Sequence, residues 1–211
     1  MPTFVTVPGM APPRLTPARL NAAGIGSFFR PRDLEPLEIP FAELRRSVAS
    51  GTVEKVGRGL YRLAAADITE HYSPAAVCAR IPRAILCLLT ALSYHEIGTQ
   101  LPRMVWIAIP HKARTPRVRD LPVRIVRFSG RYLDVGVESV FLEGVPARIT
   151  NPARTVIDCF RFRRLVGYDV ALEAIKWAIM DRKATPAEIC KVAKACRAES
   201  LVRPYLELLQ V

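Results

Sequence analysis

The stretch that most constrains the fold spans residues 39–63, with the sequence IPFAELRRSVASGTVEKVGRGLYRL. Its first half predicts a short amphipathic helix, because Phe41, Leu44 and Val48 recur at spacings of three and four residues and line one apolar stripe. Gly51 is expected to end this helix, since glycine readily takes the backbone conformation that follows a last helical turn. We therefore expect a helix that packs on a core through this stripe.

A tight β-hairpin is predicted directly after the helix. Residues 53–56 and 60–63 are two short strand candidates. The GRG turn between them is flexible enough to reverse the chain, and it holds Arg58 at its tip. Lys55 and Arg62 add positive charge to the strands. A short helix followed at once by a basic hairpin is the plan of a recognition helix and its wing.

The polar side of the predicted helix indicates which kind of ligand the chain could bind. A face of small residues with a protruding arginine fits a DNA major groove, where arginine makes paired hydrogen bonds to guanine. The alternative is an ordinary solvated helix face. The basic hairpin that follows favours the nucleic-acid interpretation. Taken at about 100° per residue, the positions facing away from the stripe are Ala42, Arg46, Ala49 and Ser50, with Arg45 nearer the border.

Two more arginines precede the recognition helix, in the segment FFRPRDLEPLEIP. Pro31 can open a short helix there, and Pro36 breaks it. Arg30 and Arg32 lie at the start of that helix, where backbone N–H groups also favour a phosphate. Contacts of this kind fix the register on DNA without reading its sequence. The residues expected to form the core under the recognition helix are Phe28, Phe29, Leu34, Leu37 and Ile39.

Charge points to a polyanion as the partner. The 211 residues carry a formal net charge of +12, and half of them are hydrophobic, so the chain can also bury a real core. Charge alone does not separate DNA from RNA or an acidic membrane surface. The longest apolar run, residues 84–89, is too short to span a bilayer, so no membrane partner is expected. The first residues do not resemble a secretory signal, and the expected location is the cytoplasm.

Cysteine and histidine spacing argues against disulfides and metal sites. The odd number of cysteines, five, on apolar faces predicts buried reduced thiols. The sequence contains no C-x-x-C pair, and its three histidines are not at ligand spacing from one another or from the cysteines. We therefore expect neither a metal nor a cofactor. The cysteines concerned are Cys78, Cys87, Cys159, Cys190 and Cys196.

The remaining pattern predicts an α+β protein with two domains. We expect a flexible arm over residues 1–15, a winged helix-turn-helix domain over 16–66 and a mixed α/β domain over 67–211. Residues 67–74 have the composition of a linker, and residues 83–97 read as one buried helix because they are apolar almost all round. Strands are expected over 104–110 and 122–128, and a hairpin over 137–150. Asn151 and Thr185, each followed by proline, predict helix starts.

A second basic surface is predicted in the larger domain. Between Arg103 and Arg131 there are eight lysines and arginines against a single acid, Asp120. Such a cluster must be exposed, and it suits a phosphate-bearing ligand or an acidic protein partner equally. A solvated loop without a partner is the third interpretation. The residues assigned to this surface are Lys112, Arg114, Arg117, Arg119, Arg124 and Arg127.

The sequence resembles a known protein family. The ordered motifs FFRPRDL, LRRSVASG and VEKVGRGLYR resemble the winged-helix domain of the AbiEi antitoxins of bacterial type IV toxin–antitoxin and abortive-infection systems. The resemblance continues through ILCLLTAL, WIAIP, TNPARTVIDCFR and VRPYLELL, and covers nearly the whole chain from about Arg19. The region before Phe28 is shorter and richer in glycine than the usual first helix of the family.

The resemblance implies a DNA-binding repressor of its own operon that also neutralises a nucleotidyltransferase toxin encoded beside it. In that picture the winged helix reads inverted repeats in the double-stranded promoter DNA, and the C-terminal domain carries the antitoxin activity. Direct contact between antitoxin and toxin is left open. The positions that match the DNA-facing residues of the family are Arg30, Arg32, Arg45, Arg46, Lys55 and Arg58.

Two other function classes stay open from the sequence. In the first, the C-terminal domain is a protein- or RNA-binding module, and the winged helix is only structural. The second is a metal-dependent nuclease, in which Asp120, Asp134 and Glu138 would hold the ion. The spacing of these acids is not distinctive, and no basic catalytic partner is fixed among them. We therefore expect a protein that binds and does not catalyse.

Overall fold

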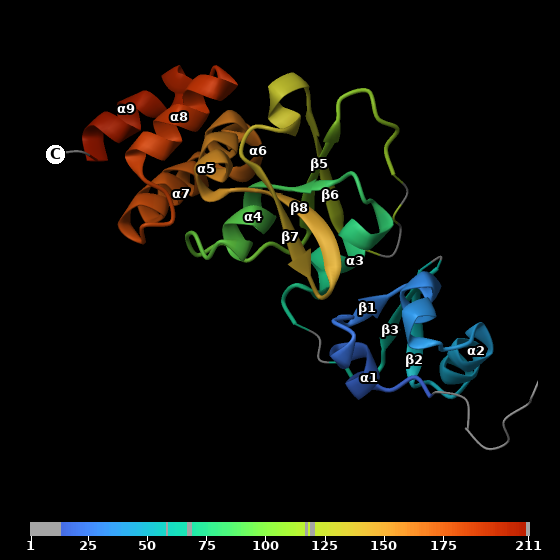
Figure 1. Cartoon of the computed structure of the whole chain (residues 1–211). Helices are drawn as coiled ribbons and strands as arrows, with labels where there is room; N and C mark the ends of the chain where they lie inside the picture. Colours follow the sequence, from blue (N-terminus) through green and yellow to red (C-terminus); the bar gives the residue numbers. More distant parts are fainter. Residues whose placement is uncertain (1–13, 58, 67–68, 117, 119–120, 210–211) are drawn as a thin grey trace, which may run out of the picture. The chain divides into compact units, whose positions relative to one another are not determined.

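Two units make up the chain in the computed structural model, which describes residues 14–57, 59–66, 69–116, 118 and 121–209 (Figure 1). One unit is Met1–Thr69 with Glu143–Val145, and the other is Glu70–Leu142 with Pro146–Val211. The expected flexible arm falls largely on residues 1–13, which lie outside the described residues. The functional division at residues 66 and 67 stays a prediction. Within the described residues, no helix is both long and apolar enough to cross a membrane.

The first unit is a winged helix-turn-helix domain, as the sequence predicts. Its three strands form an antiparallel sheet in the order β1-β3-β2, with β2 and β3 as the hairpin of the wing. The first helix is short and is capped by the Thr16 hydroxyl, which accepts a hydrogen bond from the Arg19 N–H at 3.4 Å. The elements are α1 (Pro17–Ala22), β1 (Phe28–Phe29), the 3-10 helix η1 (Pro31–Leu37), α2 (Phe41–Ala49), β2 (Val53–Gly57) and β3 (Leu60–Leu63).

The core of this unit lies between α2, η1 and the sheet. Leu44 of α2 and Leu34 of η1 are buried there with Phe29 of β1. Phe28 and Ile39 are also buried, as predicted, and Leu37 is half-buried against the same cluster. The short strand β1 pairs with β3, which ties the two phenylalanines to the wing.

The predicted apolar stripe of α2 is wrong at one position. Phe41 leaves 57% of its surface exposed, whereas Glu43 and Ser47 are buried beside Leu44. Phe41 is the first residue of the helix, so no preceding turn packs over it. The polar Glu43 tolerates burial because its carboxylate pairs with Arg46. The Ser47 backbone carbonyl accepts from the Thr52 hydroxyl at 3.0 Å.

The second unit is built on a mixed sheet in the strand order β6-β5-β4-β8-β7. Strands β5 and β6 run parallel, β4 is antiparallel to β5, and β4 is parallel to β8. The expected strands over 104–110 and 122–128 and the expected hairpin are confirmed. The strand bounds are β4 Ile85–Leu86, β5 Val105–Pro110, β6 Val123–Phe128, β7 Val137–Leu142 and β8 Val145–Thr150.

Helices cover this sheet and form the C-terminal end of the chain. Helices α5, α7, α8 and α9, coloured orange to red, pack on one another (Figure 1). Both predicted caps are confirmed, since Asn151 accepts from the Arg154 N–H and Thr185 accepts from the Glu188 N–H. The helices are α3 (Tyr72–Arg80), α4 (Leu88–Tyr94), η2 (Gly130–Leu133), α5 (Pro152–Arg161), α6 (Arg163–Val166), α7 (Tyr168–Met180), α8 (Pro186–Cys196) and α9 (Glu199–Leu209).

Three expectations about this unit are corrected. Residues 83–97 do not form one helix, because they contain β4 followed by α4. Strand β4 lies between β5 and β8 and is buried, and such a central strand has the same continuous apolar sequence as a buried helix. The segment expected as a linker contains the start of α3. Cys190 is exposed on α8, whereas the other four cysteines are buried.

Candidate nucleic-acid interface

The exposed side of α2 has small residues at its centre and an arginine on each flank. At about 100° per residue, Ala42 and Ala49 lie within about 20° of each other around the helix axis. Arg45 and Arg46 then fall about 50° to either side of them. All four residues are exposed. The backbone of this helix can therefore approach a flat or grooved ligand closely, with a guanidinium on each flank.

The two arginines of α2 differ in what holds them. Arg46 Nη1 lies 2.5 Å from Glu43 Oε2, although 68% of the Arg46 side chain is exposed. Within the described part of the chain, Arg45 makes no hydrogen bond or ion pair. Arg46 is therefore held along the helix, while Arg45 can reach outward. Sequence reasoning placed Arg46 at the centre of the contact face and could not see this pair.

The end of α2 is fixed to the start of the wing by hydroxyl groups. The Ser50 Oγ donates to the Ser47 carbonyl at 3.1 Å and lies 3.0 Å from the Thr52 Oγ1. Ser50 is exposed, as the sequence predicts, but its hydroxyl is used within this turn. Ser50 therefore holds the helix end in place at the edge of the face.

The wing contributes one exposed cation in the described residues of β2 and β3. Lys55 of β2 is exposed and pairs in register with Tyr61 of β3. Arg58, expected at the tip, lies outside the described residues. Arg62 is buried, contrary to its expected place on a basic surface. Its guanidinium donates to the Ala66 carbonyl at 2.7 Å, so Arg62 closes the end of the hairpin.

The start of η1 is occupied by a carboxylate from its own first turn. Asp33 Oδ2 accepts a hydrogen bond from the Arg30 N–H at 2.7 Å. Arg30 is half-buried, whereas the Arg32 side chain is 76% exposed and lies 3.6 Å from Asp33 Oδ1. Because Asp33 already accepts from this backbone group, a phosphate contact here would come from an arginine side chain, and Arg32 is the more exposed of the two.

The second basic surface is partly described. Lys112 and Arg114 are exposed in the loop after β5, and Arg124 and Arg127 are exposed on β6, the edge strand of the sheet. The Arg124 guanidinium also lies 5.3 Å from the centre of the Trp106 ring. Arg117 and Arg119, together with the acid Asp120, lie outside the described residues.

Arg127 has a structural task within this surface. Its Nη1 donates to the backbone carbonyls of His111 at 2.7 Å and Ala113 at 2.9 Å. Its Nη2 donates to the Thr115 hydroxyl at 3.0 Å. One exposed guanidinium therefore holds the loop that carries Lys112 and Arg114 against the edge strand.

The first unit is similar in sequence to a known protein family. Residues 18–64 match the family described as "Transcriptional regulator, AbiEi antitoxin". Over these residues the chain is similar to the AbiEi antitoxins. The AbiEi match runs from α1 to the end of the wing and includes the whole exposed face of α2.

Beyond the AbiEi match, the chain resembles a solved structure in fold. The crystal structure of the RV2827C protein from Mycobacterium tuberculosis superposes with a TM-score of 0.55 at 15% identity. The likeness covers 91% of this chain and 78% of that chain. At this identity it concerns the fold alone. No curated protein matches the chain.

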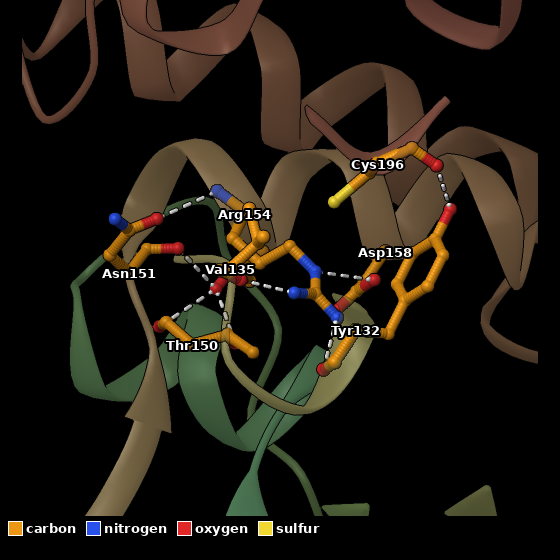
Figure 2. A network of polar contacts seen from close by, with 8 residues as sticks. Tyr132, Val135, Thr150, Asn151, Arg154, Asp158 and Cys196 are labelled. Carbon is orange, nitrogen blue, oxygen red and sulfur yellow. Dashed lines mark hydrogen bonds and ion pairs between the residues drawn. The ribbon is translucent and has the colours of Figure 1, made fainter. Parts of the chain in front are cut away.

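Outside the AbiEi match, a buried charged network organises the second unit (Figure 2). The Arg154 and Asp158 side chains of α5 are both fully buried, and Arg154 Nε donates to Asp158 Oδ1 at 3.0 Å. Arg154 also donates to the carbonyls of Tyr132, at 3.0 Å, and Val135. The Tyr132 hydroxyl donates to the Cys196 carbonyl at 2.8 Å. The network therefore joins α5 to η2 and to the end of α8.

Burial and the neighbouring positive charge shift the pKa of Asp158 in opposite directions. Burial raises the pKa of Asp158 to about 6, and the Arg154 charge opposes that rise. The Arg154 guanidinium also lies 4.7 Å from the centre of the Tyr132 ring. Sequence analysis missed this pair, although the four-residue spacing of an arginine and an aspartate on one predicted helix could have revealed it.

The acids considered for a nuclease do not form a metal site in the described residues. Asp134 and Glu138 are both exposed, and Asp134 Oδ1 lies 3.6 Å from Arg148 Nη2. Across the part of the chain that the structure describes, no group of three or more His, Cys, Asp or Glu side chains is placed to hold an ion.

Proposed function

We propose that the chain is a DNA-binding antitoxin that represses its own operon by placing α2 in the major groove of promoter DNA. The observation that carries the proposal is the exposed face of α2, with Ala42 and Ala49 between Arg45 and Arg46. Small central residues let the helix backbone approach base edges, and arginine pairs with guanine through two hydrogen bonds. The match of residues 18–64 to a family described as transcriptional regulators supports the same role.

The other cations of the first unit would position the domain on the phosphate backbone. Arg32 and Lys55 are exposed on η1 and β2, and we assign Arg30 and Arg58 to the same group. Phosphate contacts add affinity without sequence preference, and they weaken steeply as salt rises. Inverted repeats in the promoter would be read by two copies of the domain.

Repression can be tested in cells with a reporter gene behind the chain's own upstream DNA. The full-length protein, supplied in trans, should lower reporter expression. The Arg45→Ala variant should relieve this repression, whereas Lys176→Ala, which removes the same charge from the exposed side of α7, should not. A reporter that responds equally to the wild type and Arg45→Ala would contradict the proposed role of α2.

The antitoxin half of the proposal concerns the second unit. We assign neutralisation of a cognate nucleotidyltransferase toxin to this unit, with the second basic surface as its contact region. Lys112 and Arg114 are exposed there, on a loop held by Arg127. The proposed role is binding, and it requires no catalytic group.

Neutralisation can be tested by co-expression with the neighbouring toxin gene. The double variant Lys112→Glu/Arg114→Glu should fail to rescue growth while still repressing the reporter. The Arg45→Ala variant should rescue growth but fail to repress the reporter. Full rescue by the Lys112→Glu/Arg114→Glu variant would contradict the assignment of this surface.

A second candidate role for the same surface is binding of a protein or an RNA, with the winged helix only structural. The exposed Arg124 on the edge strand β6 favours it, because edge strands are open to partners. In that case the Arg45→Ala variant would have no effect on the reporter, and the toxin or its RNA substrate would co-purify with the full-length chain.

A further inference from the structure

The first residue of α2, Phe41, has a large aromatic side chain that is not packed in the core. Phe41 leaves 57% of its surface exposed, while the buried positions of the helix go to Glu43, Leu44 and Ser47. Among the described residues, Phe41 does not belong to the hydrophobic cluster under the helix. The fold therefore does not explain why this position is a phenylalanine.

Phe41 lies where a recognition helix meets base edges. The N-terminal residues of such a helix are the ones that contact bases. Phe41 and Arg45 are four residues apart, so their side chains are neighbours on one side of α2. If Arg45 reaches a guanine, Phe41 faces an adjacent base pair on the same side of the helix.

We infer that Phe41 reads a thymine in the bound DNA by packing its ring against the thymine C5 methyl group. This inference rests on the proposed function, in which α2 enters the major groove. A phenyl ring has no hydrogen-bonding group, and the thymine methyl is the apolar group that base pairs present in the major groove. The contact removes water from both apolar surfaces. Phe41 is thus a specificity residue beside Arg45.

The inference can be tested by removing only the methyl group from the DNA. Uracil keeps every hydrogen-bonding group of thymine and lacks the methyl. The affinity of the full-length protein would be measured for its upstream duplex made with thymine or with uracil, and for a shuffled duplex made both ways. For each bound copy of the domain, the wild type should bind the thymine form of the upstream duplex about three- to fivefold more tightly, which is the effect of burying one methyl group.

The Phe41→Ala variant should bind the thymine and uracil forms equally. Phe41→Leu should keep part of the preference, because leucine still offers an apolar surface. Leu101→Ala is the matched control, since Leu101 is 86% exposed and lies in the second unit. The control variant should keep the full thymine preference. Equal melting temperatures would show that Phe41→Ala leaves the fold intact.

Two results would overturn the inference and leave the proposed function standing. In the first, the wild type prefers upstream over shuffled DNA but binds its thymine and uracil forms equally. In the second, Phe41→Ala keeps the thymine preference of the wild type. Equal binding of upstream and shuffled DNA by the wild type would instead contradict the proposed function. The inference on Phe41, which rests on that function, would then be contradicted as well.

Discussion

Arg46 Nη1 and Glu43 Oε2 lie 2.5 Å apart, one helical turn from each other on α2. Glu43 is buried against the core, so the pair holds the Arg46 side chain along the helix. Arg45, the next residue in the chain, makes no hydrogen bond or ion pair within the described residues. Two adjacent arginines therefore have different tasks, with Arg46 tied to the fold and Arg45 available to a ligand.

The first prediction is that the two arginines contribute differently to the free energy of unfolding. Arg46→Ala leaves the buried Glu43 carboxylate without its partner, and the free energy of unfolding should fall by about 0.5–1 kcal/mol, because the arginine end of the pair is screened by solvent. Arg45→Ala should change it by less than about 0.5 kcal/mol. Urea unfolding of the two variants measures both. An equal loss in the two variants would show that the Glu43 pair does not distinguish the arginines.

The second prediction concerns the buried pair of the second unit. Arg154→Met removes the partner of a fully buried carboxylate and three side-chain hydrogen bonds, to Asp158, Tyr132 and Val135. Breaking such a pair from one side costs about 3–5 kcal/mol. We expect a loss of this size in the free energy of unfolding, measured by chemical denaturation of the full-length protein.

The double variant Arg154→Met/Asp158→Leu is the matched control for this pair. It removes both charges and replaces them with apolar side chains, so part of the stability should return. If the double variant is less stable than Arg154→Met alone, the cost arises from the lost carbonyl contacts of Tyr132 and Val135 and not from an unpaired charge.

The third prediction concerns a half-buried histidine, His95. His95 Nε2 lies 2.7 Å from the Thr150 carbonyl oxygen, and burial lowers the pKa of His95 below its usual value of 6.5. The unfolded chain therefore takes up this proton at a higher pH than the folded chain. As the pH falls below about 6.5, His95 should reduce the stability of the fold, because the unfolded state binds more protons.

The His95→Gln variant isolates this effect, since glutamine can still donate to the Thr150 carbonyl but does not titrate. The wild type should lose unfolding free energy relative to the variant as the pH falls from about 7.5 to about 5.5. Comparing the two proteins cancels the contribution of Asp158, whose raised pKa acts in the opposite direction. A difference that stays constant over this range would contradict the prediction.

The fourth prediction concerns thiol reactivity. Burial raises the pKa of Cys78 to about 12, and it also raises the pKa values of Cys87 and Cys159. Cys190 is the exposed thiol, while Cys196 is buried. A thiol reagent should therefore label Cys190 alone in the native protein, and all five cysteines after denaturation. Native Cys190→Ser should not react, and rapid labelling of that variant would show that a second thiol is accessible.

Local patterns were enough to predict most elements of the fold. The pairing of β2 with β3, the capped helix starts at Asn151 and Thr185 and the alternation in β6 each depend on neighbouring residues. The helix predicted over residues 83–97 was wrong because the burial of β4 depends on strands β5 and β8, which are distant in sequence. A short apolar run does not by itself show whether it is a buried helix or a strand covered by neighbouring strands.

Exposure and pairing within the candidate site were harder to predict. Helical periodicity placed Phe41 in the core, but periodicity does not show where the core ends along the helix axis. The burial of Arg62 and the pairing of Arg46 depend on where single carbonyl and carboxylate oxygens lie. Positive charge in the sequence therefore overstated how many of these arginines are available to DNA.

The exposed face of α2 is proposed to read DNA sequence. The most direct measurement is the affinity of the full-length protein for its own upstream duplex and for a shuffled duplex of the same composition, at one fixed salt concentration. The wild type should prefer the upstream duplex, and Arg45→Ala should lower that preference by about 1–3 kcal/mol. Lys176→Ala should keep it. Equal affinity of the wild type for the two duplexes would contradict the claim.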